Sequence, residues 1–320
     1  MIINGINYNI SDIYDQSVTI PDSFVIKENK TGKGHGEAKL YMGSKDSMRY
    51  FYTGNPNNEG FVVKCFVLKR DLISLLKTIK HEYQYPSIKY RGIGAGKNML
   101  KLWKARMEYA ETLPDIIIFE IKDQQQIRGP RGYVKSIKNR MGYDLIRTMT
   151  LPFVSYISVM KVQEIQTQEI SFYWRPFADF TQMASLQYAA QHYGKGKKGD
   201  LQHRKSQVKY REELYNEFHH CPFTQIDEFR LLVASHIKPY AVSSKKEQTD
   251  SNNGLLLSPL YDKLFDKGYI SFDNDGHILI SEWLSPRNKE LISFVFSPAD
   301  LNLNEQRLQY MKYHRENVFK

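Results

Sequence analysis

Three neighbouring stretches in the C-terminal third decide the local fold: Ala234–Pro239 (ASHIKP), Asn253–Pro259 (NGLLLSP) and Tyr261–Asp266 (YDKLFD). The first is typical of a strand end, with His236 close to the point where the strand stops. The second opens with Asn-Gly, a dipeptide that favours a turn. Ser258 followed by Pro259 is a common helix start, because proline fits the first helical position. We therefore predict one compact strand–loop–helix unit.

The sequence around this unit predicts further short elements. A helix is expected from about Leu201 to Phe218, and a strand pair around 229–240. The expected helix 258–265 is followed by strands at 269–272 and 277–280, joined by the turn-forming sequence Asp273-Asn274-Asp275-Gly276. A final helix is expected from Asn302 to Tyr313. The C-terminal third therefore has its own set of elements and its own apolar positions.

The first 180 residues have a different pattern, with strong β character. Apolar runs predict four strands, and helical periodicity predicts two helices between them. The expected strands cover 61–68, 115–121, 154–160 and 169–174, and the expected helices cover 71–79 and 98–112. Three glycines among lysines at 194–199 indicate a basic linker. We predict an α+β protein with a mixed α/β N-terminal domain at 1–190, a linker at 191–200 and a second domain at 201–320.

Composition limits the partners that the chain can have. The 320 residues carry a formal net charge of +10, an excess that favours a polyanion such as nucleic acid. The two cysteines, Cys65 and Cys221, are too few for a disulfide framework or a four-ligand zinc site. Residues 1–5 do not look like a signal peptide, and no window approaches 18 consecutive apolar residues. We expect a cytoplasmic protein.

Three residues of the opening stretches suit the hydrolysis of a phosphodiester. Such a reaction needs a base to activate water, a metal to stabilise charge on the phosphate, and a frame that fixes both. His236 suits the base, because the pKa of histidine lies near neutrality. Asp262 suits a metal ligand, because hard divalent ions such as Mg²⁺ take carboxylate oxygens. Asn253 can fix the loop through hydrogen bonds to backbone groups.

At this point the sequence resembles the HNH (ββα-metal) endonucleases, in the branch found at the C-termini of bacterial restriction enzymes. The resemblance covers roughly the last 115 residues, and its motifs are specific as an ordered set. The residues that carry it are Gln207, Tyr210, Arg211, the stretches 220–224, 234–239 and 252–259, the stretch 261–268, and the tail 313–319.

The resemblance implies a role for each of the three residues. His236 would be the general base, Asn253 the structural asparagine, and Asp262 a metal ligand where many relatives carry their last histidine. Ser235 stands where many relatives have a further ligand, so the second protein ligand is left open. Asp266 could help to hold the metal or could instead stabilise the turn at Gly268. The resemblance also implies 5′-phosphate and 3′-hydroxyl products.

A nuclease domain of this size has little means of choosing a sequence, so we expect the N-terminal domain to read the DNA. Arginines on a Gly-rich loop could reach base edges in a groove, and lysines in the basic linker could contact phosphates. The residues expected to bind DNA are Arg128, Arg131, Lys195, Lys197, Lys198 and Arg204.

These inferences lead to a hypothesis with two alternatives. We expect a sequence-specific, Mg²⁺-dependent restriction endonuclease that cuts double-stranded DNA. Cutting both strands calls for two active sites, so we expect a homodimer, and a restriction system implies a cognate methyltransferase. One alternative is a modification-dependent enzyme that reads a methylated base. The other is a non-catalytic DNA-binding protein with a decayed HNH site, for which Ser235 is the best support.

Overall fold

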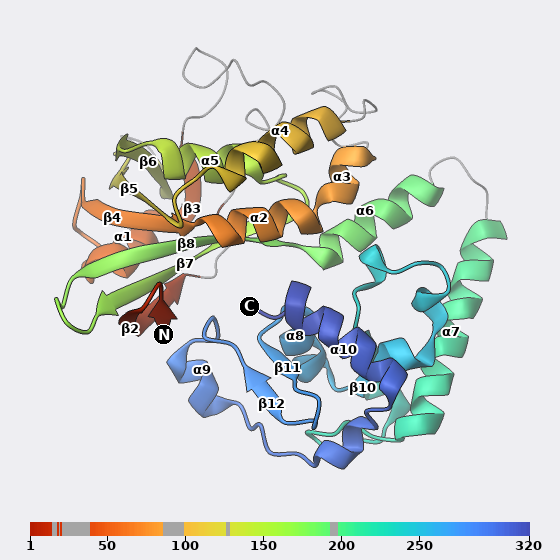
Figure 1. Cartoon of the computed structure of the whole chain (residues 1–320). Helices are drawn as coiled ribbons and strands as arrows, with labels where there is room; N and C mark the ends of the chain where they lie inside the picture. Colours follow the sequence, from red (N-terminus) through yellow and green to blue (C-terminus); the bar gives the residue numbers. More distant parts are fainter. Residues whose placement is uncertain (15–17, 19, 21–38, 86–98, 126–128, 193–197) are drawn as a thin grey trace. The chain divides into compact units, whose positions relative to one another are not determined.

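The protein is described by a computed structural model that covers residues 1–14, 18, 20, 39–85, 99–125, 129–192 and 198–320 (Figure 1). The side chains of residues 188–192 and 198–205 are outside this description. The chain forms two compact units, Met1–Asp179 and Phe180–Lys320. The structure is mixed α/β, as the sequence predicted.

The first unit is built on a large curled sheet of eight strands in the order β1-β2-β7-β8-β4-β5-β6-β3. All neighbouring strands run antiparallel except β4 and β8, which are parallel. The strands are β1 (Ile2–Ile3), β2 (Ile6–Tyr14), β3 (Leu40–Ser44), β4 (Val62–Leu68), β5 (Ile116–Asp123), β6 (Arg131–Lys138), β7 (Ser155–Glu164) and β8 (Ile170–Ala178). The four strands predicted from apolar runs are therefore confirmed as β4, β5, β7 and β8.

Among the described residues of this unit, five helices accompany the sheet. They are α1 (Lys45–Thr53), α2 (Lys69–Thr78), α3 (Lys80–Gln84), α4 (Leu100–Glu111) and α5 (Met141–Met149). The two predicted helices are confirmed as α2 and α4. Helix α1 is capped by Ser44, whose Oγ accepts a hydrogen bond from the Ser47 N–H at 3.1 Å. Helix α5 packs on β5 at Gly142, where a Cβ atom would lie 2.4 Å from the Phe119 ring.

The second unit begins with two helices, α6 (Phe180–His192) and α7 (Lys198–Phe218). Residues 191–192 belong to α6 and residues 198–200 belong to α7, so both ends of the expected linker at 191–200 are helical. The domain limits themselves stay a prediction. The residues between the helices, 193–197, lie outside the described part of the chain. Helix α7 begins three residues before the expected start at Leu201.

The rest of the second unit surrounds a short ββα arrangement. Its regular elements are β9 (Val233–His236), β10 (Gly254–Leu257), α8 (Pro259–Asp266), β11 (Ile270–Phe272), β12 (Ile278–Ile280), α9 (Pro286–Leu291) and α10 (Glu305–Asn317). Five 3₁₀ turns lie between them: η4 (Phe229–Leu231), η5 (Tyr240–Val242), η6 (Glu247–Thr249), η7 (Ser251–Asn253) and η8 (Pro298–Leu301). Strands β9 and β10 pair antiparallel, with Gly254 opposite His236. The hairpin β11–β12 and the final helix follow the prediction.

A strand pair within 229–240 is wrong. Residues 229–231 form the turn η4, and β9 pairs with β10 across the intervening loop. The apolar core explains this choice, because all four residues of β10 are buried. The core of the unit also includes Leu214, Phe265 and Met311, from α7, α8 and α10. The ββα unit is therefore held between two long helices.

Candidate active site

His236 is the last residue of β9, and its imidazole is held by a backbone group of the following loop. Its Nε2 lies 3.1 Å from the carbonyl oxygen of Gln248. A carbonyl oxygen only accepts hydrogen bonds, so Nε2 carries the proton. Nδ1, which has no hydrogen-bond partner among the described residues, is then the nitrogen with a free lone pair. The Tyr210 ring stacks on the imidazole, with centroids 4.5 Å apart and planes 17° apart.

Burial also favours the neutral form of this histidine. It lowers the pKa of His236 below its ordinary value, because a charged imidazolium loses hydration there, and the hydrogen bond to Gln248 only partly opposes this. A histidine that is neutral near pH 7, with a free nitrogen, can accept a proton.

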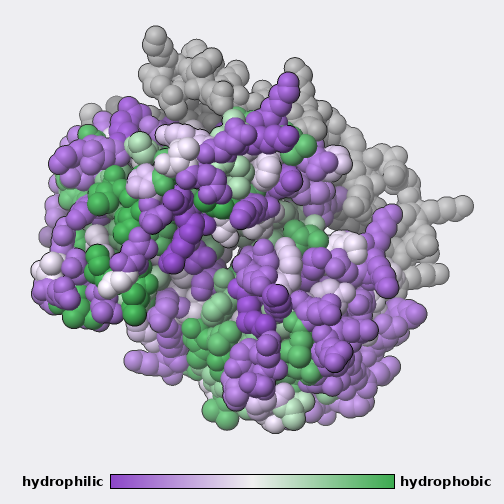
Figure 2. All heavy atoms as spheres, in the orientation of Figure 1, coloured by the Kyte–Doolittle hydropathy of each residue, from purple (hydrophilic) through white to green (hydrophobic). Residues whose placement is uncertain are grey.

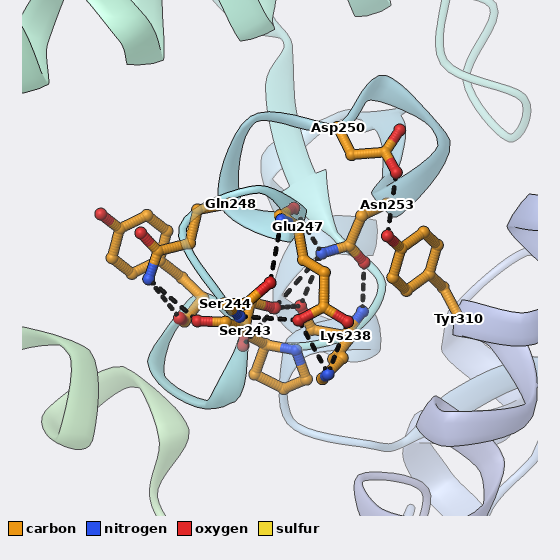
Figure 3. Close-up of polar contacts among 10 residues, drawn as sticks. Lys238, Ser243, Ser244, Glu247, Gln248, Asp250, Asn253 and Tyr310 are labelled. Carbon is orange, nitrogen blue, oxygen red and sulfur yellow. Dashed lines mark hydrogen bonds and ion pairs between the residues drawn. The ribbon is translucent and has the colours of Figure 1, made fainter.

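Asn253 lies on the other side of the loop and is fully buried. Its Oδ1 accepts the Lys238 N–H at 2.7 Å, and its Nδ2 donates to the carbonyls of Lys238 (3.2 Å) and Glu247 (3.0 Å). Figure 3 shows these bonds closing the loop between β9 and β10. Asn253 can therefore hold the loop through its amide, and its catalytic importance stays a prediction.

The expected Asn-Gly turn is wrong. Gly254 has φ −148°, which is extended, and it begins strand β10. Its small size is needed for a different reason: a Cβ atom here would lie 2.3 Å from Tyr210 Oη and 2.6 Å from a Leu214 methyl group. Glycine at this position lets α7 approach the strand pair.

Asp262 and Asp266 lie one helical turn apart on α8 and line the same pocket as Ser235 and His236. The pocket has a volume of about 300 Å³. Burial raises the pKa of Asp262. Burial and the charge of Asp262 raise the pKa of Asp266 to about 7, although Lys263 and Lys267 oppose the shift. The Asp266 side chain makes no hydrogen bond to the Gly268 turn, or to any other group in the described part of the chain.

The donor set fits a divalent cation. Two partly buried carboxylates share the pocket, and neither forms an ion pair with another described residue. Ser235 Oγ is buried and lacks a hydrogen-bond partner among the described groups. Ser235 lies close enough to Asp262 to lower the pKa of that carboxyl, although the two groups do not have the geometry of a hydrogen bond. Carboxylate and hydroxyl oxygens are ligands that hard cations accept.

Helix α6 contributes the opposite wall of this pocket, which sequence reasoning missed. Phe180, Thr181, Ala184 and Ser185 line it, and Gln187 Nε2 donates to the Ala241 carbonyl at 2.9 Å. The expected domain limits placed these residues with the first domain. No motif marks them, because only the fold brings α6 next to η5. The Gln248 carbonyl was missed for a similar reason, since it is a backbone group.

The structure describes only some of the residues that we expect to bind DNA. Arg128, Lys195 and Lys197 are outside the described residues, and Lys198 and Arg204 lie on α7. Arg131 begins β6 and is exposed, with its guanidinium carbon 5.8 Å from the centre of the Tyr41 ring.

No described helix is long and apolar enough to cross a membrane. The face drawn in Figure 2 is largely hydrophilic, with smaller hydrophobic areas.

Comparison with known proteins identifies a family for part of the chain. No curated protein matches the chain. Residues 221–273 match a protein-family model described as HNH endonuclease. The matched segment contains His236, Asn253, Asp262 and Asp266, and it ends before α9 and α10. The C-terminal region of this chain therefore contains an HNH endonuclease domain, which indicates a nuclease that acts on DNA.

Proposed function

We propose that the protein is a divalent-metal-dependent endonuclease of restriction type that hydrolyses double-stranded DNA. The observation that carries the proposal is the placement of His236 in one pocket with Asp262 and Asp266, with Nδ1 left as a free base. Catalysis by a positioned base needs a nitrogen of suitable pKa that is held in one orientation. The proposed pocket offers both.

In the proposed reaction, His236 Nδ1 accepts a proton from a water molecule as the water oxygen attacks phosphorus. The bond between phosphorus and O3′ then breaks, and O3′ takes a proton from solvent. The products are a 5′-phosphate and a 3′-hydroxyl. Asn253 keeps the loop closed during the reaction, and the Tyr210 ring limits rotation of the imidazole.

Asp262 is the first proposed ligand of the metal, and Asp266 the second. A bound divalent ion, most simply Mg²⁺, would stabilise negative charge on the phosphate and on the leaving oxygen. With Asp266 on the same face of α8, the site would not need a ligand at position 235. Asp266 is therefore our proposal for the second protein ligand, which Ser235 leaves open.

The first unit is the proposed reader of the DNA sequence. A formal net charge of +10 supports a polyanionic ligand, and Arg131 is an exposed cation beside an aromatic ring. Because duplex cutting needs two active sites, we propose a homodimer. A restriction enzyme also requires a methyltransferase that protects the host sites.

A plasmid-cutting assay with His236→Ala tests the proposal. We expect the variant to bind DNA as the native protein does, and to cut about 10²- to 10⁴-fold more slowly in the presence of Mg²⁺. The control is His277→Ala, which removes an exposed histidine at the β11–β12 turn. Undiminished cutting by His236→Ala would remove the base from the mechanism. A native protein that binds DNA and never cuts it would favour the decayed-site alternative.

A further inference from the structure

The loop that presents the Gln248 carbonyl to His236 is fixed by an ion pair that no motif of the sequence marks. Lys238 Nζ lies 2.8 and 2.9 Å from the two carboxylate oxygens of Glu247. Both side chains are mostly buried, with 19% and 26% of their surfaces exposed. Lys238 follows β9 by two residues, and Glu247 directly precedes Gln248. The pair therefore joins the two ends of the loop that holds the imidazole.

Glu247 is bound on its other side as well. Its Oε2 accepts the Ser244 N–H at 2.6 Å, and its own N–H donates to Ser244 Oγ at 3.3 Å. This reciprocal pattern has the spacing of a capping box and closes the turn between Ser244 and Glu247, where η6 begins. Partial burial raises the pKa of the Glu247 carboxyl, but the hydrogen bonds from Lys238 and Ser244 outweigh it and hold that pKa below its ordinary value. Glu247 is therefore ionised at neutral pH and oriented from two sides.

The side chain of Gln248 completes the closure. Its Nε2 donates to the carbonyls of Tyr240 (3.1 Å) and Ser243 (3.2 Å), which lie in the same loop (Figure 3). The backbone carbonyl of Gln248 is then left to accept the hydrogen bond from His236. The ion pair, the bonds between Glu247 and Ser244, and the side-chain bonds of Gln248 together determine where this carbonyl oxygen lies.

Helix α10 supports the loop from outside the segment that matches the HNH family. Lys238 Nζ lies 5.3 Å from the centre of the Tyr313 ring. Tyr310 Oη donates to Asp250 Oδ2 at 2.9 Å, and Arg307 Nη2 donates to the Ser251 carbonyl at 3.2 Å. Residues 307, 310 and 313 are spaced three apart, so they lie near one face of the helix.

We propose that Lys238 and Glu247 are a positioning pair for His236. The pair holds the Gln248 carbonyl against Nε2 and so keeps Nδ1 free to act as the base. Neither residue touches the DNA or the reacting atoms in this proposal. The inference rests on the proposed function only for its effect on cutting, since the state of the imidazole can be measured without DNA.

The first measurement is ¹⁵N NMR of His236 in the metal-free protein, because the two ring nitrogens report which one carries the proton. We expect the Nε2–H tautomer alone in the native protein, and a mixture of tautomers in Glu247→Gln. Glutamine is similar in size and can still accept the Ser244 N–H, but it cannot form the ion pair. The control is Glu282→Gln, which breaks the exposed Lys289–Glu282 pair in the same unit.

The second measurement is single-turnover cutting of a plasmid at saturating Mg²⁺. Glu247→Gln and Lys238→Met should each slow cutting about 10- to 100-fold while DNA affinity stays within about twofold, because misplacement of a base affects the chemical step. Lys238→Arg, which retains the ion pair, should restore most of the rate. If Glu247→Gln does not fold, the comparison of Lys238→Met with Lys238→Arg gives the same test.

The proposal is overturned if Glu247→Gln and Lys238→Met both keep the Nε2–H tautomer and cut as fast as Glu282→Gln. It is also overturned if Lys238→Arg is as slow as Lys238→Met. A native protein that never cuts DNA would refute the nuclease proposal instead, and the tautomer comparison would still decide the role of the pair.

Discussion

Asp262 and Asp266 lie on the same face of α8 and line one pocket, so that the Asp266 carboxyl experiences the negative charge of Asp262. Burial and this charge make ionisation of Asp266 unfavourable in the folded protein, and a bound cation would offset that cost. The pair is therefore better explained by ligand binding than by stability. Two predictions follow from these two residues.

The first prediction concerns metal affinity. Asp262→Asn and Asp266→Asn should each weaken Mn²⁺ binding by at least about 10-fold, because each removes a charged oxygen ligand. Isothermal titration calorimetry on the protein without DNA measures this directly. Glu290→Gln, an exposed carboxylate on α9, is the control and should bind the metal as the native protein does. Native affinity in Asp266→Asn would exclude this residue as a ligand.

The second prediction concerns the stability of the metal-free protein. The folded-state pKa of Asp266 is raised to about 7, so ionisation of this group disfavours the folded state at every pH above its unfolded pKa of about 3.9. Asp266→Asn removes the charge and should raise the free energy of unfolding by about 1 kcal/mol or more at pH 8 in EDTA. Urea unfolding would show the gain. A loss of stability would mean that the carboxylate has a stabilising partner.

The third prediction concerns Gly268, the glycine that follows α8. It has φ +69°, and a Cβ atom would lie 2.0 Å from the Val318 carbonyl oxygen, a backbone group that cannot move aside. Gly268→Ala should cost about 3 kcal/mol or more, through left-handed strain and displacement of the C-terminal segment. The control is Gly54→Ala, which has φ +75° with no atom within 4 Å, and which should cost only about 1 to 2 kcal/mol. Urea unfolding of both variants compares the two costs.

The sequence predicted the parts of the fold that are written in local patterns. Strands β4, β5, β7 and β8 and helices α2 and α4 have strong periodicity, and the order His236, Asn253, Asp262 is an ordered motif. Edge strands such as β3 were missed because their pairing partners, here β6, lie far along the chain. The partner of β9 was misassigned because pairing with β10 spans a 17-residue loop, Ile237–Asn253, whose closure depends on the buried amide of Asn253.

In the candidate site, too, local sequence patterns predicted some features, while others depend on distant parts of the chain. The motif indicated a candidate base and one candidate ligand, but the tautomer of His236 depends on a backbone carbonyl that no residue type reveals. Asn-Gly suggested a turn from its chemistry alone, whereas Gly254 is required by the approach of Tyr210. The wall formed by α6 depends on which unit that helix joins, and the apolar pattern of the helix does not contain this information.

The fourth prediction concerns acid stability and His314, a buried residue of α10. Its Nε2 lies 3.1 Å from the Phe265 carbonyl and its Nδ1 lies 2.9 Å from Ser271 Oγ, so both nitrogens of the neutral ring are satisfied. Burial lowers the pKa of His314 to about 3. The unfolded chain therefore binds this proton below pH 6.5, whereas the folded chain does not, so His314 weakens the fold as the pH falls from 6.5 towards 3.

The expected loss from this residue is about 1.4 kcal/mol per pH unit in that range. Urea unfolding of the native protein between pH 7.5 and 5 measures the slope. His314→Gln should remove this contribution and flatten the slope, although it should lower stability at pH 7.5 by about 1 to 3 kcal/mol through lost hydrogen bonds and ring stacking on Phe265. Replacing the exposed His277 by glutamine should leave the slope unchanged. If His314→Gln retained the native slope, another group would have to be responsible for the acid sensitivity, and the buried neutral imidazole would be the wrong explanation.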